Sequence, residues 1–127
     1  MSDLQCAATL LLAGVRGDDD AAALGTSLQD RRVAVVYTDD APGTGDAVGA
    51  LSRALAAPVR SEPDLREGLV SPAEVLEQLA DQHRGETVLV LAAAETLERL
   101  LGSRGGVPSV GAAAEVRIDA DGWAFGS

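Results

Sequence analysis

Carboxylates are the main side chains of this sequence that could do chemistry, and they follow two of its apolar runs. Asp18–Asp20 come shortly after Ala7–Ala13, and Asp39 and Asp40 come just after Val33–Tyr37. Carboxylate oxygens are the ligands that Mg²⁺ prefers in proteins, and a bound ion could activate water or orient a substrate. Asp39 and Asp40 are the stronger candidates, because a turn after a buried strand holds its side chains at the sheet edge. The alternative is that the aspartates are solvated or complement a helix N-terminus.

Nucleophiles and amines are scarce in the sequence. The chain has one histidine, His83, one cysteine, Cys6, and ten basic residues that are all arginine. The absence of lysine excludes Walker-type phosphate loops, Schiff-base chemistry and receiver-type phosphorylation sites. A lone cysteine beside a predicted strand forms no intramolecular disulfide and is expected to be a small buried side chain.

The composition favours one compact acidic domain over residues 1–127. Hydrophobic residues make up 46% of the chain but aromatic residues only 2%. The core is therefore expected to consist of Ala, Val and Leu, without a large ligand-enclosing cavity. A formal net charge of −10 opposes binding to nucleic acids or anionic membranes. With no apolar run near the roughly 20 residues of a membrane span and no signal-peptide pattern, a cytoplasmic protein is expected.

Apolar runs and helical spacings alternate along the chain. Strands are expected at residues 7–13, 33–37 and 88–92, with a short strand around Val59 and a hairpin of Val116–Ile118 with Trp123–Phe125. Helices are expected from Asp18, over Ala47–Leu55, from Pro72 to His83 with Ser71 as N-cap and Glu74 in the capping box, and over Glu95–Leu101. The buried helix faces are expected to hold Ala21, Leu24 and Leu28 in the first helix and Ala47, Val48, Leu51, Ala54 and Leu55 in the second.

This order predicts an α/β fold, a three-layer α/β/α sandwich with a mostly parallel sheet. Ligands of such sheets bind beyond the carboxyl ends of the strands. Gly14–Asp20, Thr38–Gly45 and Ala92–Glu95 are therefore expected on one rim of the sheet.

Residues 85–95, which read GETVLVLAAAE, resemble the second signature of the histidine phosphatase (phosphoglycerate mutase-like) superfamily, GETVLVVSHGG. Other segments are similar to that family in the same order: Thr9–Ala13 to the strand before its Arg-His-Gly motif, Val36–Asp40 to its VYSSP strand end, Pro63–Glu67 to its LRE segment, and Asp119–Trp123 to its closing hairpin. The resemblance implies a truncated phosphoglycerate mutase-like fold, since the chain is shorter than typical members.

The resemblance also implies a nucleophilic histidine, phosphate-binding arginines and a second histidine, and this sequence departs from that pattern. The first motif falls on Gly14 and Val15, or with a one-residue shift on Val15 and Arg16. The phosphate-binding arginine corresponds to about Gly43 and the second histidine to Ala93. Glu67 stands in the place of an acid that some members use for proton transfer, although a loop glutamate is more often solvated or capping.

The charge of the expected rim is also reversed relative to that family. The expected rim has one basic residue, Arg16. Its acidic residues are Asp18, Asp19, Asp20, Asp39, Asp40, Asp46 and Glu95. A carboxylate about 4 Å from a phosphate oxygen costs on the order of 4 kcal/mol at an effective dielectric constant of about 20. A phosphate ester should therefore be rejected.

Two hypotheses follow. The first is a catalytically inactive domain without a cofactor that binds a protein partner, a second copy or a non-phosphate ligand. Its candidate ligand-binding residues are Arg16, Thr38, Asp39, Asp40, Glu67 and Glu95. The second is an enzyme with replacement chemistry on the acidic rim, with Asp39 and Asp40 as Mg²⁺ ligands.

A homodimer is expected because two-fold dimers are the commonest oligomers. Val107–Val110 and Trp123–Phe125 are candidate contact segments, although Trp123 could simply cover a sheet edge.

Overall fold

The computed structural model describes residues 7–14, 18–38, 45–62, 72–92, 97–98, 113–119 and 122–125. These residues form a six-stranded sheet with the strand order β3-β2-β4-β1-β5-β6. Its strands are β1 (Ala8–Ala13), β2 (Val33–Thr38), β3 (Val59–Ser61), β4 (Thr87–Leu91), β5 (Ala113–Asp119) and β6 (Gly122–Phe125). The described helices are α1 (Asp18–Leu28), the short 3₁₀ helix η2 (Gln29–Arg31), α2 (Gly45–Leu55) and α4 (Pro72–Gln82).

The sheet is mostly parallel, as the sequence predicts. β1 pairs in parallel with β4, β4 with β2, and β2 with β3. β5 runs antiparallel to β1, and β6 runs antiparallel to β5. The hairpin expected near the end of the chain is therefore confirmed, and it extends the parallel sheet at one side.

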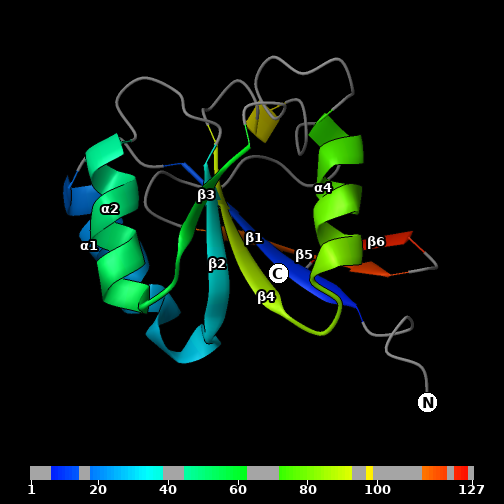
Figure 1. The fold of residues 1–127 in the computed structure, drawn as a ribbon, viewed down its shortest axis with the longest axis horizontal. Coiled ribbons are helices and arrows are strands. Elements are labelled where there is room, and N and C mark those ends of the chain that lie inside the picture. Colours follow the sequence, from blue (N-terminus) through cyan, green and yellow to red (C-terminus); the bar gives the residue numbers. More distant parts are fainter. Residues whose placement is uncertain are drawn as a thin grey trace.

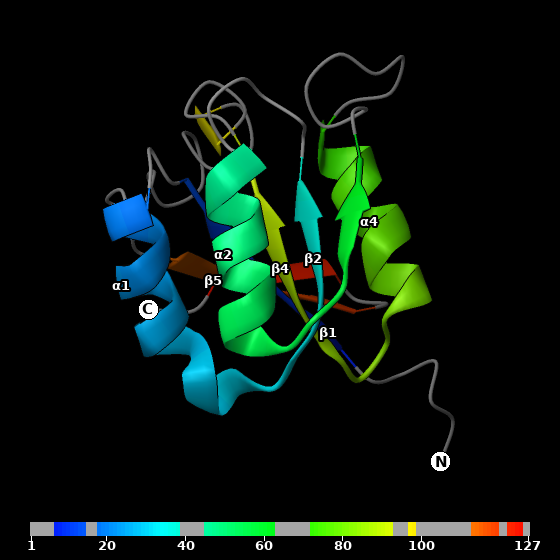
Figure 2. The same ribbon diagram turned by 60° about the vertical axis from the view of Figure 1, so that its left-hand side comes forward.

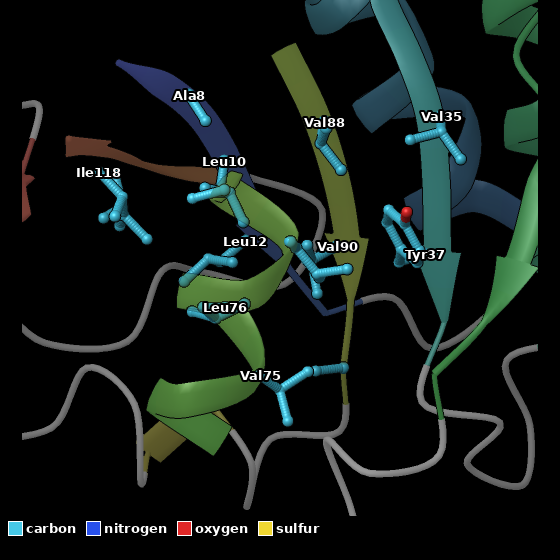
Figure 3. Close-up of a cluster of buried hydrophobic side chains, with 14 of the residues drawn as sticks. Ala8, Leu10, Leu12, Val35, Tyr37, Val75, Leu76, Val88, Val90 and Ile118 are labelled. Atoms are coloured by element: carbon cyan, nitrogen blue, oxygen red, sulfur yellow. The ribbon is translucent and has the colours of Figure 1, made fainter. Parts of the chain in front are cut away.

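Helices cover both faces of the sheet, which gives the three layers (Figures 1 and 2). Helices α1 and α2 lie on one face, where Leu24 and Leu51 pack against Leu11 and Leu89. Helix α4 lies on the other face (Figure 3). There Leu76 and Leu79 belong to one buried cluster with side chains from the strands, among them Leu10, Leu12, Val88, Val90 and Val116.

The helices on both faces of the sheet explain why the strand sequences are continuous apolar runs. Successive side chains of a strand point to opposite faces, and both faces of the central strands are buried. In β1, Leu10 and Leu12 face the α4 side, whereas Leu11 and Ala13 face the α1 and α2 side. The described core consists almost entirely of Ala, Val and Leu, as expected from the composition.

The observed boundaries differ from the predicted ones by a few residues. α2 begins at Gly45, which the sequence placed in a loop, and α4 ends at Gln82, so that His83 lies in the following turn. Pro72 opens α4 as predicted, while Ser71 lies outside the described residues. Of the helix expected over Glu95–Leu101, Leu97 and Glu98 are described and are helical.

Where side-chain burial is described, it agrees with the predicted helix faces except at Ala54, with Leu55 half-buried and Ala47 untested. Ala21, Leu24 and Leu28 of α1 are buried, as are Val48 and Leu51 of α2. Ala54 is exposed, because it lies at the margin of the contact between α1 and α2, next to Gly25.

The edge strand β6 places Trp123 on the α4 side of the sheet. Trp123 is half-buried and packs against the core there, which agrees with a role in covering the sheet edge. Val107–Val110 and Cys6 lie outside the described residues. None of the helices in the described ranges is long and apolar enough to cross a membrane.

Candidate functional site

Three parallel strands end side by side at one edge of the sheet. Ala13 of β1 pairs with Leu91 of β4, and Leu91 pairs with Thr38 of β2. We call the described residues at these ends, Ala13, Gly14, Thr38, Leu91 and Ala92, the carboxyl edge. It is the place where parallel α/β sheets bind ligands. The segments beginning at Gly14, Thr38 and Ala92 therefore start next to one another, as the sequence predicts.

Most of the candidate residues named from the sequence lie outside the described residues, so their prediction is not tested. They are Val15, Arg16, Asp39, Asp40, Gly43, Glu67, Ala93 and Glu95. Gly14 and Thr38 are the candidates that the structure describes. The backbone of Asp18–Asp20 forms the first turn of α1.

Thr38 is the buried polar residue of the described core, with 5% of its surface exposed. It ends β2, and its carbonyl oxygen accepts a hydrogen bond of 2.7 Å from the backbone N–H of Glu62, which follows β3. A threonine hydroxyl can donate and accept hydrogen bonds, so Thr38 brings a polar side chain to an otherwise apolar strand end.

Space at the end of β1 is filled by an apolar side chain. A β-carbon on Gly14 would lie 3.3 Å from Leu97 Cδ1 and 3.5 Å from the carbonyl oxygen of Ala92. Leu97 is 2% exposed, and the N–H of Ala92 donates to the carbonyl oxygen of Ala13 at 3.1 Å. The end of β1 is therefore closely packed against Leu97, a residue that sequence reasoning placed only within a helix. The sequence feature that could have indicated this packing is the apolar side chain of Leu97.

The histidine of this chain lies at the other end of the sheet. His83 is in the turn that connects the end of α4 to the amino end of β4, and Figure 1 shows this connection at the edge of the sheet opposite the carboxyl end of β4. Its Nε2 atom is 2.7 Å from the Tyr37 hydroxyl oxygen, and its Nδ1 atom is 2.9 Å from Glu86 Oε1. The two rings meet edge to face with centroids 5.6 Å apart. Sequence reasoning missed this network, although a glutamate three residues after the histidine was a signal.

Ion pairs in the described ranges join other parts of the fold. Arg31 of η2 lies 2.6 Å from Glu115 of β5, and Arg117 lies 3.5 Å from the same carboxylate. Arg84 pairs with Asp81 at 2.6 Å. Among the residues that the structure describes, no group of three or more His, Cys, Asp or Glu side chains could hold a metal ion.

The sequence matches no known protein family profile and no curated protein. Solved structures do match. YhfR from Bacillus stearothermophilus has a TM-score of 0.76 and 14% identity, over 93% of this chain and 95% of that chain. Phosphoglycerate mutase from Plasmodium falciparum has a TM-score of 0.67 and 16% identity, over 96% and 90% of the two chains. SixA from Agrobacterium tumefaciens, described as a phosphohistidine phosphatase, has a TM-score of 0.63 and 16% identity, over 97% and 96%. The chain therefore has a phosphoglycerate mutase-like fold, as its motifs predict.

Proposed function

We propose that this chain is a non-catalytic domain on a phosphoglycerate mutase-like fold, and that it acts by binding a protein partner, a second copy or a ligand other than a phosphate ester. The observation that carries the proposal is the location of His83. Histidine phosphatase chemistry, as the motifs imply it, uses two histidines at the carboxyl ends of the strands. The one histidine of this chain instead lies four residues before the start of β4, and its ring is hydrogen-bonded to Tyr37 and Glu86.

The packing at the end of β1 supports the same proposal. Leu97 contacts the position where a side chain on Gly14 would begin, so this strand end is occupied by apolar atoms. A phosphate group needs hydrogen-bond donors and positive charge, and an apolar side chain provides neither. The likeness to phosphatases and mutases thus extends to the fold, which can carry functions unrelated to the chemistry of its relatives.

The alternative of an acidic, Mg²⁺-binding rim depends on Asp39 and Asp40, which lie outside the described residues. A metal titration separates the two functions. A metal that binds only the folded state raises the midpoint of thermal unfolding by mass action. We expect no rise with millimolar Mg²⁺, Mn²⁺ or Ca²⁺, and a saturable rise that disappears in Asp39→Asn/Asp40→Asn would establish the alternative.

The proposal is tested by turnover and by ligand-dependent stability. We expect no hydrolysis of p-nitrophenyl phosphate above the buffer rate, and no increase in thermal stability with millimolar inorganic phosphate. The matched control is Arg16→Ala/Glu67→Ala, which removes the remaining candidate groups of a phosphate site. Turnover or phosphate stabilisation that is present in the wild type and absent in this variant would overturn the proposal. Light scattering then measures whether the partner is a second copy, and mass spectrometry identifies a co-purified protein.

A further inference from the structure

A chain of hydrogen bonds joins three separate segments on the α4 side of the sheet. Tyr37 is on β2, His83 is in the turn after α4, and Glu86 directly precedes β4. Tyr37 is 3% exposed, the His83 side chain is 13% exposed, and the Glu86 side chain is 51% exposed. The network therefore runs from a solvent-facing carboxylate to a buried phenol.

The donors and acceptors have one consistent arrangement when the imidazole ring is neutral. A carboxylate accepts hydrogen bonds and donates none, so Nδ1 of His83 carries the hydrogen and donates to Glu86. Nε2 is then an acceptor and receives the hydrogen of the Tyr37 hydroxyl. This arrangement satisfies a buried hydroxyl group that is otherwise surrounded by apolar residues such as Val35 and Val90 (Figure 3).

The pairing of β2 with β4 is irregular near the start of β2. Its pairing with β4 shifts between Val33 and Val35, which face Thr87 and Val88. Residues two apart in a regular strand share a face, yet Val33 packs on the α1 and α2 side and Val35 on the α4 side. Ala34 is thus an extra residue in the ladder. On its other side, β2 pairs only with the three exposed residues of β3.

A one-residue slip of a strand moves every side chain to the other face. In the observed register, Tyr37 faces α4 and His83, and Thr38 ends the strand at the carboxyl edge. A slip would separate Tyr37 from His83 and displace Thr38 from its pairing with Leu91. The hydrogen bond therefore favours one register of the last part of β2.

We propose that His83 is a positioning residue for the carboxyl edge: by holding Tyr37 it fixes the register of β2 and the position of Thr38. Its relevance to binding rests on the proposed function, because the carboxyl edge is the candidate binding site.

The experiment is NMR on the isotope-labelled full chain, in which the single histidine and single tyrosine make the ring signals unambiguous. In the neutral ring, long-range proton–nitrogen correlations should show hydrogen on Nδ1 and an acceptor at Nε2. Tyr37→Phe should remove the hydrogen bond at Nε2. Amide exchange of Val35–Thr38 should then accelerate about tenfold relative to Leu10–Leu12 of β1, because β2 opens locally.

The matched control is Glu86→Gln, which keeps an acceptor for Nδ1–H and should leave the exchange of β2 unchanged. His83→Phe, which keeps an aromatic ring, is the second variant and should reproduce the effect of Tyr37→Phe. Hydrogen on Nε2 in the wild type, or exchange that changes equally in β1 and β2 or not at all, would overturn the positioning role. These measurements use no ligand, so they are independent of the turnover and phosphate tests of the proposed function.

Discussion

Leu97 Cδ1 lies next to the position that a side chain on Gly14 would occupy, 3.3 Å from an added β-carbon. This contact joins the residue after β1 to the described helical residues beyond β4. The carboxyl end of β1 is therefore closely packed, so adding a side chain there to rebuild a phosphatase site should lower the free energy of unfolding.

Gly14→His should therefore destabilise the protein and fail to create activity. Inserting a side chain into a packed site costs roughly 1–3 kcal/mol of unfolding free energy. Urea unfolding measures the loss, and p-nitrophenyl phosphate hydrolysis should remain at the buffer rate. Leu97→Ala alone should cost about 2–5 kcal/mol because it leaves a cavity. The loss in the double variant should be smaller than the sum of the two single losses, since the imidazole can enter the vacated space. Fully additive losses would show that the two positions do not contact.

The packing of α1 on α2 leads to a second prediction, at Gly25. A β-carbon there would lie 3.3 Å from the β-carbon of Ala54 and 3.6 Å from Leu51 Cδ2. Gly25→Val should lower the unfolding free energy by about 1–3 kcal/mol, because the helices cannot approach as closely. Ala22→Val, at an exposed position of the same helix, is the control and should change stability by less than about 1 kcal/mol. Unchanged or increased stability of Gly25→Val would show that the two helices accommodate the added side chain.

The main elements of the fold were predictable because the sheet is buried on both faces. An apolar run such as Ala8–Ala13 then stands out without any alternation, and the predicted strand differs from β1 by one residue. Pro72 likewise gave the start of α4 correctly. Ala54 was misjudged because helical spacing assigns a face but not the margin of that face, which depends on where α1 packs.

The location of the candidate site could be predicted from the sequence, but most of the side-chain contacts near it could not. The alternation of strands and helices predicts parallel strands whose carboxyl ends lie at one edge, where Gly14, Thr38 and Ala92 are found, but it does not predict the strand order. The contact of Leu97 with Gly14 and the hydrogen bond of Tyr37 with His83 could not be predicted, because each joins residues far apart in sequence. The Tyr37–His83 pair is separated by 46 residues, and its geometry also depends on the irregular pairing at Val33 and Val35.

Two glycines should respond to alanine with opposite signs. Gly122 opens β6 with a φ of +128°, a conformation that L-residues rarely adopt, so Gly122→Ala should cost about 1–3 kcal/mol even though nothing lies within 4 Å of the new atom. Gly49 lies inside α2, and its added β-carbon would meet only Arg53 Nη1 at 3.8 Å. Gly49→Ala should stabilise the protein by about 0.5–1 kcal/mol through helix propensity. Thermal and urea unfolding check both signs, and stabilisation by Gly122→Ala would contradict the observed positive φ of Gly122.

The carboxylate of Glu115 should make a salt-dependent contribution to stability. It accepts a hydrogen bond of 2.6 Å from Arg31 Nη2 and lies 3.5 Å from Arg117 Nε, and its side chain is 23% exposed. Glu115→Gln should lower the unfolding free energy by about 0.2–1 kcal/mol, as for other partly exposed ion pairs. The difference from wild type should shrink in about 1 M salt, where the Debye length is about 3 Å.

Asp81→Asn is the matched control for this pair. Asp81 is 70% exposed and pairs with Arg84 three residues later, so its loss should be smaller than that of Glu115→Gln. Urea unfolding of both variants at low and high salt gives the comparison. A Glu115→Gln effect that is independent of salt would mean that the side chain stabilises β5 through packing or a neutral hydrogen bond, and not through its charge.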